Sequence, residues 1–153
     1  MSDFQIIPFE NKFVHHFINL NLEWLKSYFK VEPYDLKILN ECKKTIIDKG
    51  GFIFFGKKKN TIIGTFAFIK NNKNSYELSK MAIKKEERGK GYGSKMLEFA
   101  ILFGKNNNWN EIYLYSNTKL KNSIYLYKKY GFKKTEIGNS PYLRGNIRMA
   151  FKY

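Results

Sequence analysis

The sequence predicts a single α+β domain, built as αβα layers in which helices cover a mixed, largely antiparallel sheet. The first observation is the order of predicted elements, β-α-α-β-β-β-α-β-α-β-β, because mixed orders of this kind are typical of α+β and layered folds. The second is the length, since 153 residues fit one domain with a substantial core. The third is the content of 14 Phe, 11 Tyr and 2 Trp, which favours a packed globule over a disordered chain. No linker or repeat interrupts the chain, so we expect one domain over residues 1–153.

The N-terminal half predicts a strand, two helices and a hairpin. Apolar residues recur at helical spacing after the first strand. Pro33 suits the first turn of a second helix, and Gly50 and Gly51 end it. The positions expected to be buried on it are Leu36, Leu39, Ile46 and Ile47. A lysine-rich turn between two apolar runs predicts the hairpin. The predicted bounds are residues 4–9 for the first strand, 13–29 for the first helix, and 52–55 and 62–70 for the hairpin strands.

The C-terminal half alternates strands with helices and ends in two closing strands. An apolar strand leads into a glycine-rich turn, and a helix with apolar spacing follows at once. Gly131 suits the C-terminal stop of the last helix. The predicted bounds are residues 76–83, 111–115, 132–137 and 147–152 for the strands, and 92–105 and 119–130 for the helices.

The glycine-rich turn at residues 88–93 is the most informative motif. It reads Arg-Gly-Lys-Gly-Tyr-Gly and opens a helix, so its backbone N–H groups are bare and the helix dipole adds partial positive charge. Such a turn suits a diphosphate. Its spacing differs from the dinucleotide-binding Gly-x-Gly-x-x-Gly, and Ser94 precedes Lys95, which is the reverse of a P-loop. On this turn alone, a purely structural strand-to-helix bend is the alternative.

A second motif lies at residues 117–132, and the two together resemble the GNAT superfamily of acetyl-CoA-dependent N-acetyltransferases. The coenzyme signature of that superfamily, Arg/Gln-x-x-Gly-x-Gly/Ala after a strand, is matched by Arg88, Gly91 and Gly93. Its second signature is an Asn at a strand end, followed by a helix with Leu-Tyr-x-x-x-Gly-Phe. The residues that match it are Asn117, Leu126, Tyr127, Gly131 and Phe132. The resemblance runs from about residue 4 to the end and implies a sheet that splays between its fourth and fifth strands, forming a coenzyme slot.

The resemblance also implies how acetyl-CoA is held. The diphosphate is expected on the backbone of the glycine-rich turn, with the Ser94 hydroxyl at the helix start. The strand before the turn is expected to bond the pantetheine arm through its backbone, and Asn117 to bind the pantetheine amides. The predicted coenzyme-binding residues are therefore Met81, Ala82, Ile83, Arg88, Gly89, Lys90, Gly91, Tyr92, Gly93, Ser94 and Asn117.

Two side chains are candidates for the chemistry. Tyr127 matches the tyrosine that in many relatives protonates the departing thiolate, although Tyr125 and Tyr130 flank it and helical spacing alone does not choose among the three. Glu77, on the strand before the turn, is the candidate general base, since an amine with a pKa near ~10.4 must lose a proton before it attacks. The alternative for Glu77 is that it attracts a cationic substrate or pairs with a lysine.

The formal net charge of +15 suggests polyanionic partners, yet the composition argues against nucleic acid as the main one. Of the 28 basic residues only Arg88, Arg144 and Arg148 are arginine, whereas proteins that read nucleic acids favour arginine for bidentate contacts. The lysines are spread along the whole chain. We therefore expect the basic surface to attract coenzyme A.

Cysteine usage and hydropathy limit which kinds of site and which cellular settings are expected. Cys42 is the only cysteine, so neither an internal disulfide nor a Cys-based metal site is expected, and we predict no metal. No apolar run approaches the roughly 18 residues that span a bilayer, so no membrane association is expected. The first residues lack the basic-then-apolar pattern of a signal peptide, and a cytoplasmic setting follows as the expectation.

The resemblance implies an acyltransferase. It would transfer an acetyl group from acetyl-CoA to a primary amine by direct attack in a ternary complex. The acceptor would be a small molecule or a peptide, and the protein a monomer or a homodimer. The alternative is a catalytically inactive module that senses acyl-CoA.

Overall fold

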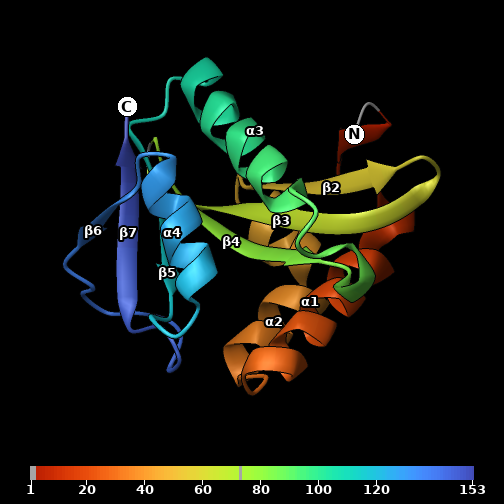
Figure 1. Cartoon of the computed structure of the whole chain (residues 1–153), viewed down its shortest axis with the longest axis horizontal. Coiled ribbons are helices and arrows are strands. Elements are labelled where there is room, and N and C mark those ends of the chain that lie inside the picture. The colour runs from red at the N-terminus through yellow and green to blue at the C-terminus, as the bar shows by residue number, and fades with distance from the viewer. Residues whose placement is uncertain (1–2, 73) are drawn as a thin grey trace.

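A computed structural model describes residues 3–72 and 74–153, and its centre is one seven-stranded sheet with the order β1-β2-β3-β4-β5-β7-β6 (Figure 1). Neighbouring strands are antiparallel except β4 and β5, which are parallel. The predicted mixed, largely antiparallel sheet is confirmed. The strands are β1 (Phe4–Pro8), β2 (Phe52–Lys58), β3 (Thr61–Asn72), β4 (Ser75–Ile83), β5 (Glu111–Ser116), β6 (Lys133–Thr135) and β7 (Ile147–Lys152).

Helices cover both faces of this sheet, as predicted. Figure 1 shows α1 and α2 on one side of β2, β3 and β4, α3 on the other side, and α4 beside β5 and β7. Short 3-10 turns precede α1 and follow β4, and a π-helical turn follows α2. The helices are α1 (Val14–Tyr28), α2 (Pro33–Asn40), α3 (Tyr92–Asn106) and α4 (Lys121–Lys129), with the π turn at Lys43–Ile47.

Two hydrophobic cores lie on the two faces of the sheet because successive strand side chains alternate between faces. Phe54, Phe66 and Phe68 pack with Met96 and Leu97 of α3 in one core, and α4 closes the same core. The other core takes the intervening strand residues with α1 and α2. Its fully buried members include Phe17, Leu39, Ile46, Phe55 and Ala67.

The second predicted helix differs from expectation in its buried face. Leu36 is 43% exposed, whereas Asp35 is fully buried together with Leu39. The Glu32 backbone N–H donates to Asp35 Oδ2 at 2.9 Å, which fixes the start of α2, and the Asp35 carboxylate then binds charged groups inside the protein. The expectation for Leu36 was wrong because hydrophobic spacing does not reveal a carboxylate that is buried by its ionic partners.

The sheet opens between β4 and β5, as expected. Their pairing is limited to Ser75–Glu77 against Glu111–Tyr113, and beyond Glu77 the strands diverge. In the diverging part β4 also carries a bulge, where Lys80 and Met81 together face one residue of β3 and Lys80 has a φ of 55°. The bulge re-aims the side chains of β4 at the place where the sheet splays.

Candidate active site

A cavity of about 100 Å³ lies where β4 and β5 diverge. It is lined by both strands, by α1 on one face of the sheet and by α4 on the other, so it connects the two helical layers. The loop that follows β6 closes one end. The residues that line it include Trp24, Ser79, Lys80, Tyr127, Tyr142 and Arg144.

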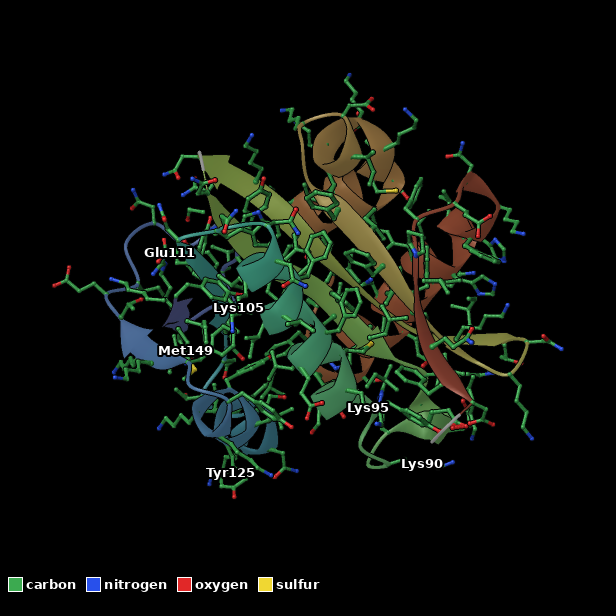
Figure 2. All side chains as sticks on the ribbon, turned by 90° about the horizontal axis from the view of Figure 1, so that it is seen from above. Lys90, Lys95, Lys105, Glu111, Tyr125 and Met149 are labelled. Atoms are coloured by element: carbon green, nitrogen blue, oxygen red, sulfur yellow. The ribbon has the colours of Figure 1, made fainter. Side chains whose placement is uncertain are left out.

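The glycine-rich turn leaves the N-terminus of α3 bare. Gly91 is the N-cap residue with a φ of 89°, a left-handed conformation that glycine adopts without strain, and no side chain caps the helix. The first-turn N–H groups therefore have no partner within the helix. A Cβ on Gly93 would meet Ile83 Cδ1 at 3.6 Å, an ordinary contact, so nothing within the chain requires glycine there. Figure 2 shows Lys90 and Lys95 at this end of α3.

The Arg88 side chain turns inward from the loop. Its Nε–H donates to the Ile83 carbonyl oxygen at 2.8 Å, and its Nη2 lies 3.5 Å from Glu23 Oε1. The guanidinium also lies 5.6 Å from the Tyr28 ring centroid. Arg88 thus ties the loop to β4 and α1.

The three tyrosines of the last predicted helix lie in different surroundings. Tyr127 lines the cavity, and its hydroxyl has no hydrogen-bond partner among the residues that the structure describes. Burial raises the pKa of Tyr127 to about 12, so the hydroxyl carries its proton at neutral pH. Tyr125 is 70% exposed on the outer side of α4 (Figure 2), and Tyr130 donates to Glu98 Oε1 at 2.7 Å. Of these three tyrosines, Tyr127 is the one that lines the cavity.

Glu77 is the last β4 residue paired with β5, and it is 5% exposed. It does not line the cavity itself. The Tyr142 hydroxyl donates to Glu77 Oε2 at 3.1 Å and lies 2.9 Å from the Ser79 hydroxyl, and both of these residues do line the cavity. Burial raises the pKa of the Glu77 carboxyl. The carboxylate is therefore linked to the cavity through two hydroxyl groups.

A buried ionic cluster beside the cavity was not predicted. Lys80 Nζ donates to Asp35 Oδ1 at 2.7 Å, and Arg144 binds both oxygens of the same carboxylate at 2.7 and 2.9 Å. Burial alone would raise the pKa of Asp35, but the hydrogen bonds from Arg144 and Lys80 lower it to about 2. Arg144 Nη1 also donates to Glu32 Oε2 at 3.1 Å. A lysine inside an otherwise buried strand was the available sequence signal, whereas the other members of the cluster lie far away in the chain.

The same cluster holds the loop that follows β6. The backbone N–H groups of Leu143 and Arg144 donate to the two Glu32 oxygens at 2.9 and 3.3 Å. Asn117 Nδ2 donates to the Arg144 carbonyl oxygen at 2.8 Å, and Asn117 Oδ1 accepts from the Lys119 N–H at 2.9 Å. Asn117 lines the cavity, but much of its amide is engaged in fixing the loop and the β5–α4 connection.

Comparison with known proteins identifies the family to which this chain belongs. The profile of the acetyltransferase (GNAT) family matches residues 15–132, which is most of the chain. The chain belongs to the GNAT family. Its glycine-rich turn and its α4 tyrosine lie within the matched residues, and no curated protein sequence matches the chain.

Solved GNAT structures share the fold over nearly the whole length. An acetyltransferase of the GNAT family from Staphylococcus aureus Mu50 is 24% identical, with a TM-score of 0.85 over 97% of this chain and 98% of that chain. Spermidine N-acetyltransferase from Vibrio cholerae, in complex with CoA and spermine, is 22% identical, with a TM-score of 0.77 over 99% and 96%. A GNAT family acetyltransferase from Elizabethkingia anophelis with acetyl-CoA bound is 20% identical, with a TM-score of 0.69 over 100% of both chains. At these identities the likeness establishes the GNAT fold.

The remaining predicted coenzyme residues of this GNAT chain lie along β4 and the turn. From Ser79 to Ala82, the edge of β4 that faces β5 has no strand partner, so its backbone groups remain available. Tyr92 is buried with its ring 4.7 Å from that of Phe4, which is a packing role. Lys90 is about half exposed and lies 3.3 Å from Glu87 Oε2.

Residues 3–72 and 74–153 contain neither a cluster of metal-ligating side chains nor a helix that could cross a membrane. Within these ranges no three His, Cys, Asp or Glu side chains come together as a metal site. Within the same ranges no helix is both long and apolar enough to cross a membrane.

Proposed function

We propose that this GNAT protein is an N-acetyltransferase that transfers the acetyl group of acetyl-CoA to a primary amine by direct attack in a ternary complex. One observation carries the proposal. A cavity at the β4–β5 splay joins the two helical layers, and the Tyr127 hydroxyl faces it without an internal partner. A site that only holds a coenzyme has no need of a half-buried proton donor that lacks a hydrogen-bond partner among the described residues.

The residues of the splay fit coenzyme A. The uncapped first turn of α3 suits a diphosphate because bare N–H groups and the helix dipole both favour anions. The free edge of β4 suits the pantetheine arm, whose amides resemble a peptide backbone. We assign the diphosphate to the turn at residues 88–93 with Ser94, and the pantetheine arm to residues 81–83, with Asn117 beside it.

Acetyl transfer requires the amine to lose a proton while its nitrogen bonds the thioester carbon. We assign the Glu77 carboxylate as the proton acceptor, acting through the Tyr142 and Ser79 hydroxyls because Glu77 does not reach the cavity. Positioned acid–base groups contribute roughly 10² to 10⁴ in rate. The raised pKa of Glu77 makes it a better base once ionised.

The carbon–sulfur bond then breaks, and the thiolate must take a proton. Tyr127 is the donor in this proposal, since it lines the cavity and stays protonated at neutral pH. The proton released by the amine and the proton given to sulfur balance, so coenzyme A leaves as the thiol. The chain returns to its starting state when Glu77 releases the proton that it accepted and Tyr127 regains one.

The alternative function is an acyl-CoA sensor without turnover. The hydroxyl links from Glu77 and the free Tyr127 hydroxyl favour the enzyme. Monomer or homodimer, an acceptor that is a small molecule or a peptide, and a cytoplasmic setting stay predictions.

Release of coenzyme thiol from acetyl-CoA over a panel of amines tests the proposal. Tyr127→Phe keeps the ring and removes the proton, so kcat should fall by about 10²-fold or more while the Kd of acetyl-CoA stays within about twofold. Tyr125→Phe is the matched control, since this tyrosine is 70% exposed on the same helix and should turn over like the wild type. Equal kcat for Tyr127→Phe and wild type would remove Tyr127 as the acid. Tight acetyl-CoA binding without release from any amine would favour the sensor.

A further inference from the structure

We propose, on the basis of the proposed function, that the acceptor is a small amine that carries a carboxylate, such as a free apolar amino acid, and not a polyamine. The inference concerns the end of the cavity that lies between α1 and the loop that follows β6. It rests on the charge of the lining, on the occupation of the aromatic faces, and on the free donors of Arg144.

The lining of the cavity contains cations and no acid. Lys80 and Arg144 line it, and none of the described lining residues is Asp or Glu. The acids of the cluster, Asp35 and Glu32, lie behind these cations and are held by them at 2.7 to 3.1 Å. A polyamine carries several positive charges, and their burial without a facing carboxylate is costly.

Two aromatic side chains of the cavity, Tyr142 and Phe29, cannot substitute for an acid, because the protein's own cations already lie over their rings. The Tyr142 ring lies 4.7 Å from Lys80 Nζ and 4.6 Å from the Arg144 guanidinium. The Phe29 ring lies 4.2 Å from Lys119 Nζ. A cation over an aromatic face requires that the face be free. These rings therefore offer an apolar wall and no cage for an alkylammonium chain.

Arg144 has donors left for an anion. A guanidinium has five N–H groups, and three of those of Arg144 donate to Glu32 and Asp35. Its Nε–H and one Nη2–H have no partner within residues 3–72 and 74–153. The Arg144 side chain is 17% exposed and lines the cavity, so these groups are within reach of a bound molecule. A carboxylate is the anion that this donor geometry matches.

The position of Arg144 also suits an amine next to the carboxylate. The Tyr142 hydroxyl, which leads to Glu77, belongs to the side chain whose ring the Arg144 guanidinium covers. The donor for the anion and the acceptor for the amine proton are therefore neighbours. Trp24 and Phe29 complete the wall with apolar surface, which favours an acceptor with an apolar body.

Matched pairs of amines test this inference. We would measure kcat/KM for L-phenylalanine against 2-phenylethylamine and for L-leucine against 3-methylbutylamine, with spermidine as the polyamine. We expect the carboxylate to raise kcat/KM at least tenfold within each pair, and spermidine to be the poorest acceptor. Equal values within the pairs, or a preference for spermidine, would overturn the inference and leave the acetyltransferase standing.

An arginine variant localises the effect. Arg144→Gln should lower kcat/KM for L-phenylalanine at least tenfold more than for 2-phenylethylamine. The control is Arg148→Gln, since Arg148 lies on β7, bonds Thr135 and does not line the cavity, so the ratio should not change. If the two variants alter the ratio equally, Arg144 is not the carboxylate site.

A binding measurement separates this inference from the proposed function. Calorimetry in the presence of coenzyme A would compare 3-phenylpropanoate with 3-phenylpropan-1-ol, neither of which is an acceptor. Tighter binding of the carboxylate by at least tenfold, lost in Arg144→Gln but not in Arg148→Gln, supports the inference even if no amine is acetylated. Equal binding of acid and alcohol overturns it whatever the turnover, and a melting curve for each variant shows that the fold is retained.

Discussion

Tyr127 and Glu77 show what individual positions contribute to this site. Tyr127 has no internal partner for its hydroxyl, while the Glu77 carboxylate is engaged with hydroxyl groups at the point where the strands part. Glu77 is buried and Tyr127 is half-buried, and burial raises the pKa of each. The direction of each pKa shift can therefore be checked by measuring how activity and stability change with pH.

Glu77→Gln tests the proton acceptor through pH. A base works only when ionised, so kcat/KM should fall as pH falls through the raised pKa of Glu77, above the ordinary carboxyl value of about 4.3. In Glu77→Gln this acid limb should vanish and kcat should drop by about 10²-fold. The measurement is kcat/KM from pH 5 to 9. An unchanged acid limb in the variant would assign it to another group.

Stability gives an independent check on Glu77. Because its pKa is raised, the folded state holds the proton more tightly than the unfolded state, and the unfolding free energy falls as pH rises through the raised pKa. Glu77→Gln lacks this loss, so it should gain stability relative to wild type between acid and neutral pH.

Substitutions at Gly93 and Arg88 should separate an effect on coenzyme affinity from an effect on the stability of the fold. A methyl at Gly93 meets only ordinary contacts, so Gly93→Ala should fold normally. Because we propose that the diphosphate binds this turn, the methyl should raise the Kd of acetyl-CoA at least tenfold. Arg88→Ala loses the bond to the Ile83 carbonyl and should cost about 1–3 kcal/mol of stability with a smaller change in Kd. Calorimetric titration and urea unfolding of both variants measure this. A larger loss of affinity in Arg88→Ala would contradict the backbone cradle.

The sequence predicted Tyr127 because the motif register selects it among three tyrosines, and the structure gives the physical difference between them. It did not predict how Arg88 and Asn117 are engaged, since their partners lie up to 65 residues away in the chain, as with Arg88 and Glu23. Side-chain hydrogen bonds of this range leave no local pattern. The bulge at Lys80 was equally hidden, because a strand with one extra residue keeps its apolar composition.

The elements were predictable where the signal is local. Hydrophobic spacing and the glycine breaks gave the order of strands and helices, and the helix over residues 92–105 differs by one residue from α3 (Tyr92–Asn106). The end of α2 was not predictable, since the chain continues into a π turn after Asn40. The prediction that α2 buries Leu36 was wrong. Asp35 is buried instead, because it binds charged side chains from β4 and from the loop that follows β6.

Asp35 joins three elements, so Asp35→Asn should destabilise the fold by about 3–5 kcal/mol at neutral pH, leaving Lys80 and Arg144 undercompensated. The pKa of Asp35, about 2, lies below its unfolded value of about 3.9, so the stabilisation is present above pH 4 and lost as pH falls toward 2. Urea unfolding at pH 7 and pH 3 should show a smaller gap between wild type and variant at pH 3. The exposed Glu41→Gln is the control and should change little. A gap independent of pH would refute the ionic explanation.

The net charge of +15 acts over the entire surface and predicts how the coenzyme arrives. Steered association slows as salt screens the field, so the association rate of acetyl-CoA should fall several-fold between 50 and 500 mM NaCl, with a smaller change in the dissociation rate. Stopped-flow binding measures both rates. An uncharged ligand of the acceptor site, 3-phenylpropan-1-ol, should show no such slope. If the alcohol and the coenzyme respond alike, salt acts on the fold and not on steering.

The divergence of β4 from β5 has a consequence for the survival of the protein in the cell. Past Glu77 the inner edge of β4 lacks a neighbouring strand, and a molecule that bonds this edge finishes the sheet. Any ligand selective for the folded state adds RT ln(1 + [L]/Kd) to its stability, about 2.7 kcal/mol at a hundredfold excess over Kd. Under the proposed function that ligand is acetyl-CoA, and its supply then sets how much destabilisation by mutation the chain tolerates. A substitution that is silent in a cell rich in acetyl-CoA would unfold the protein in a starved one.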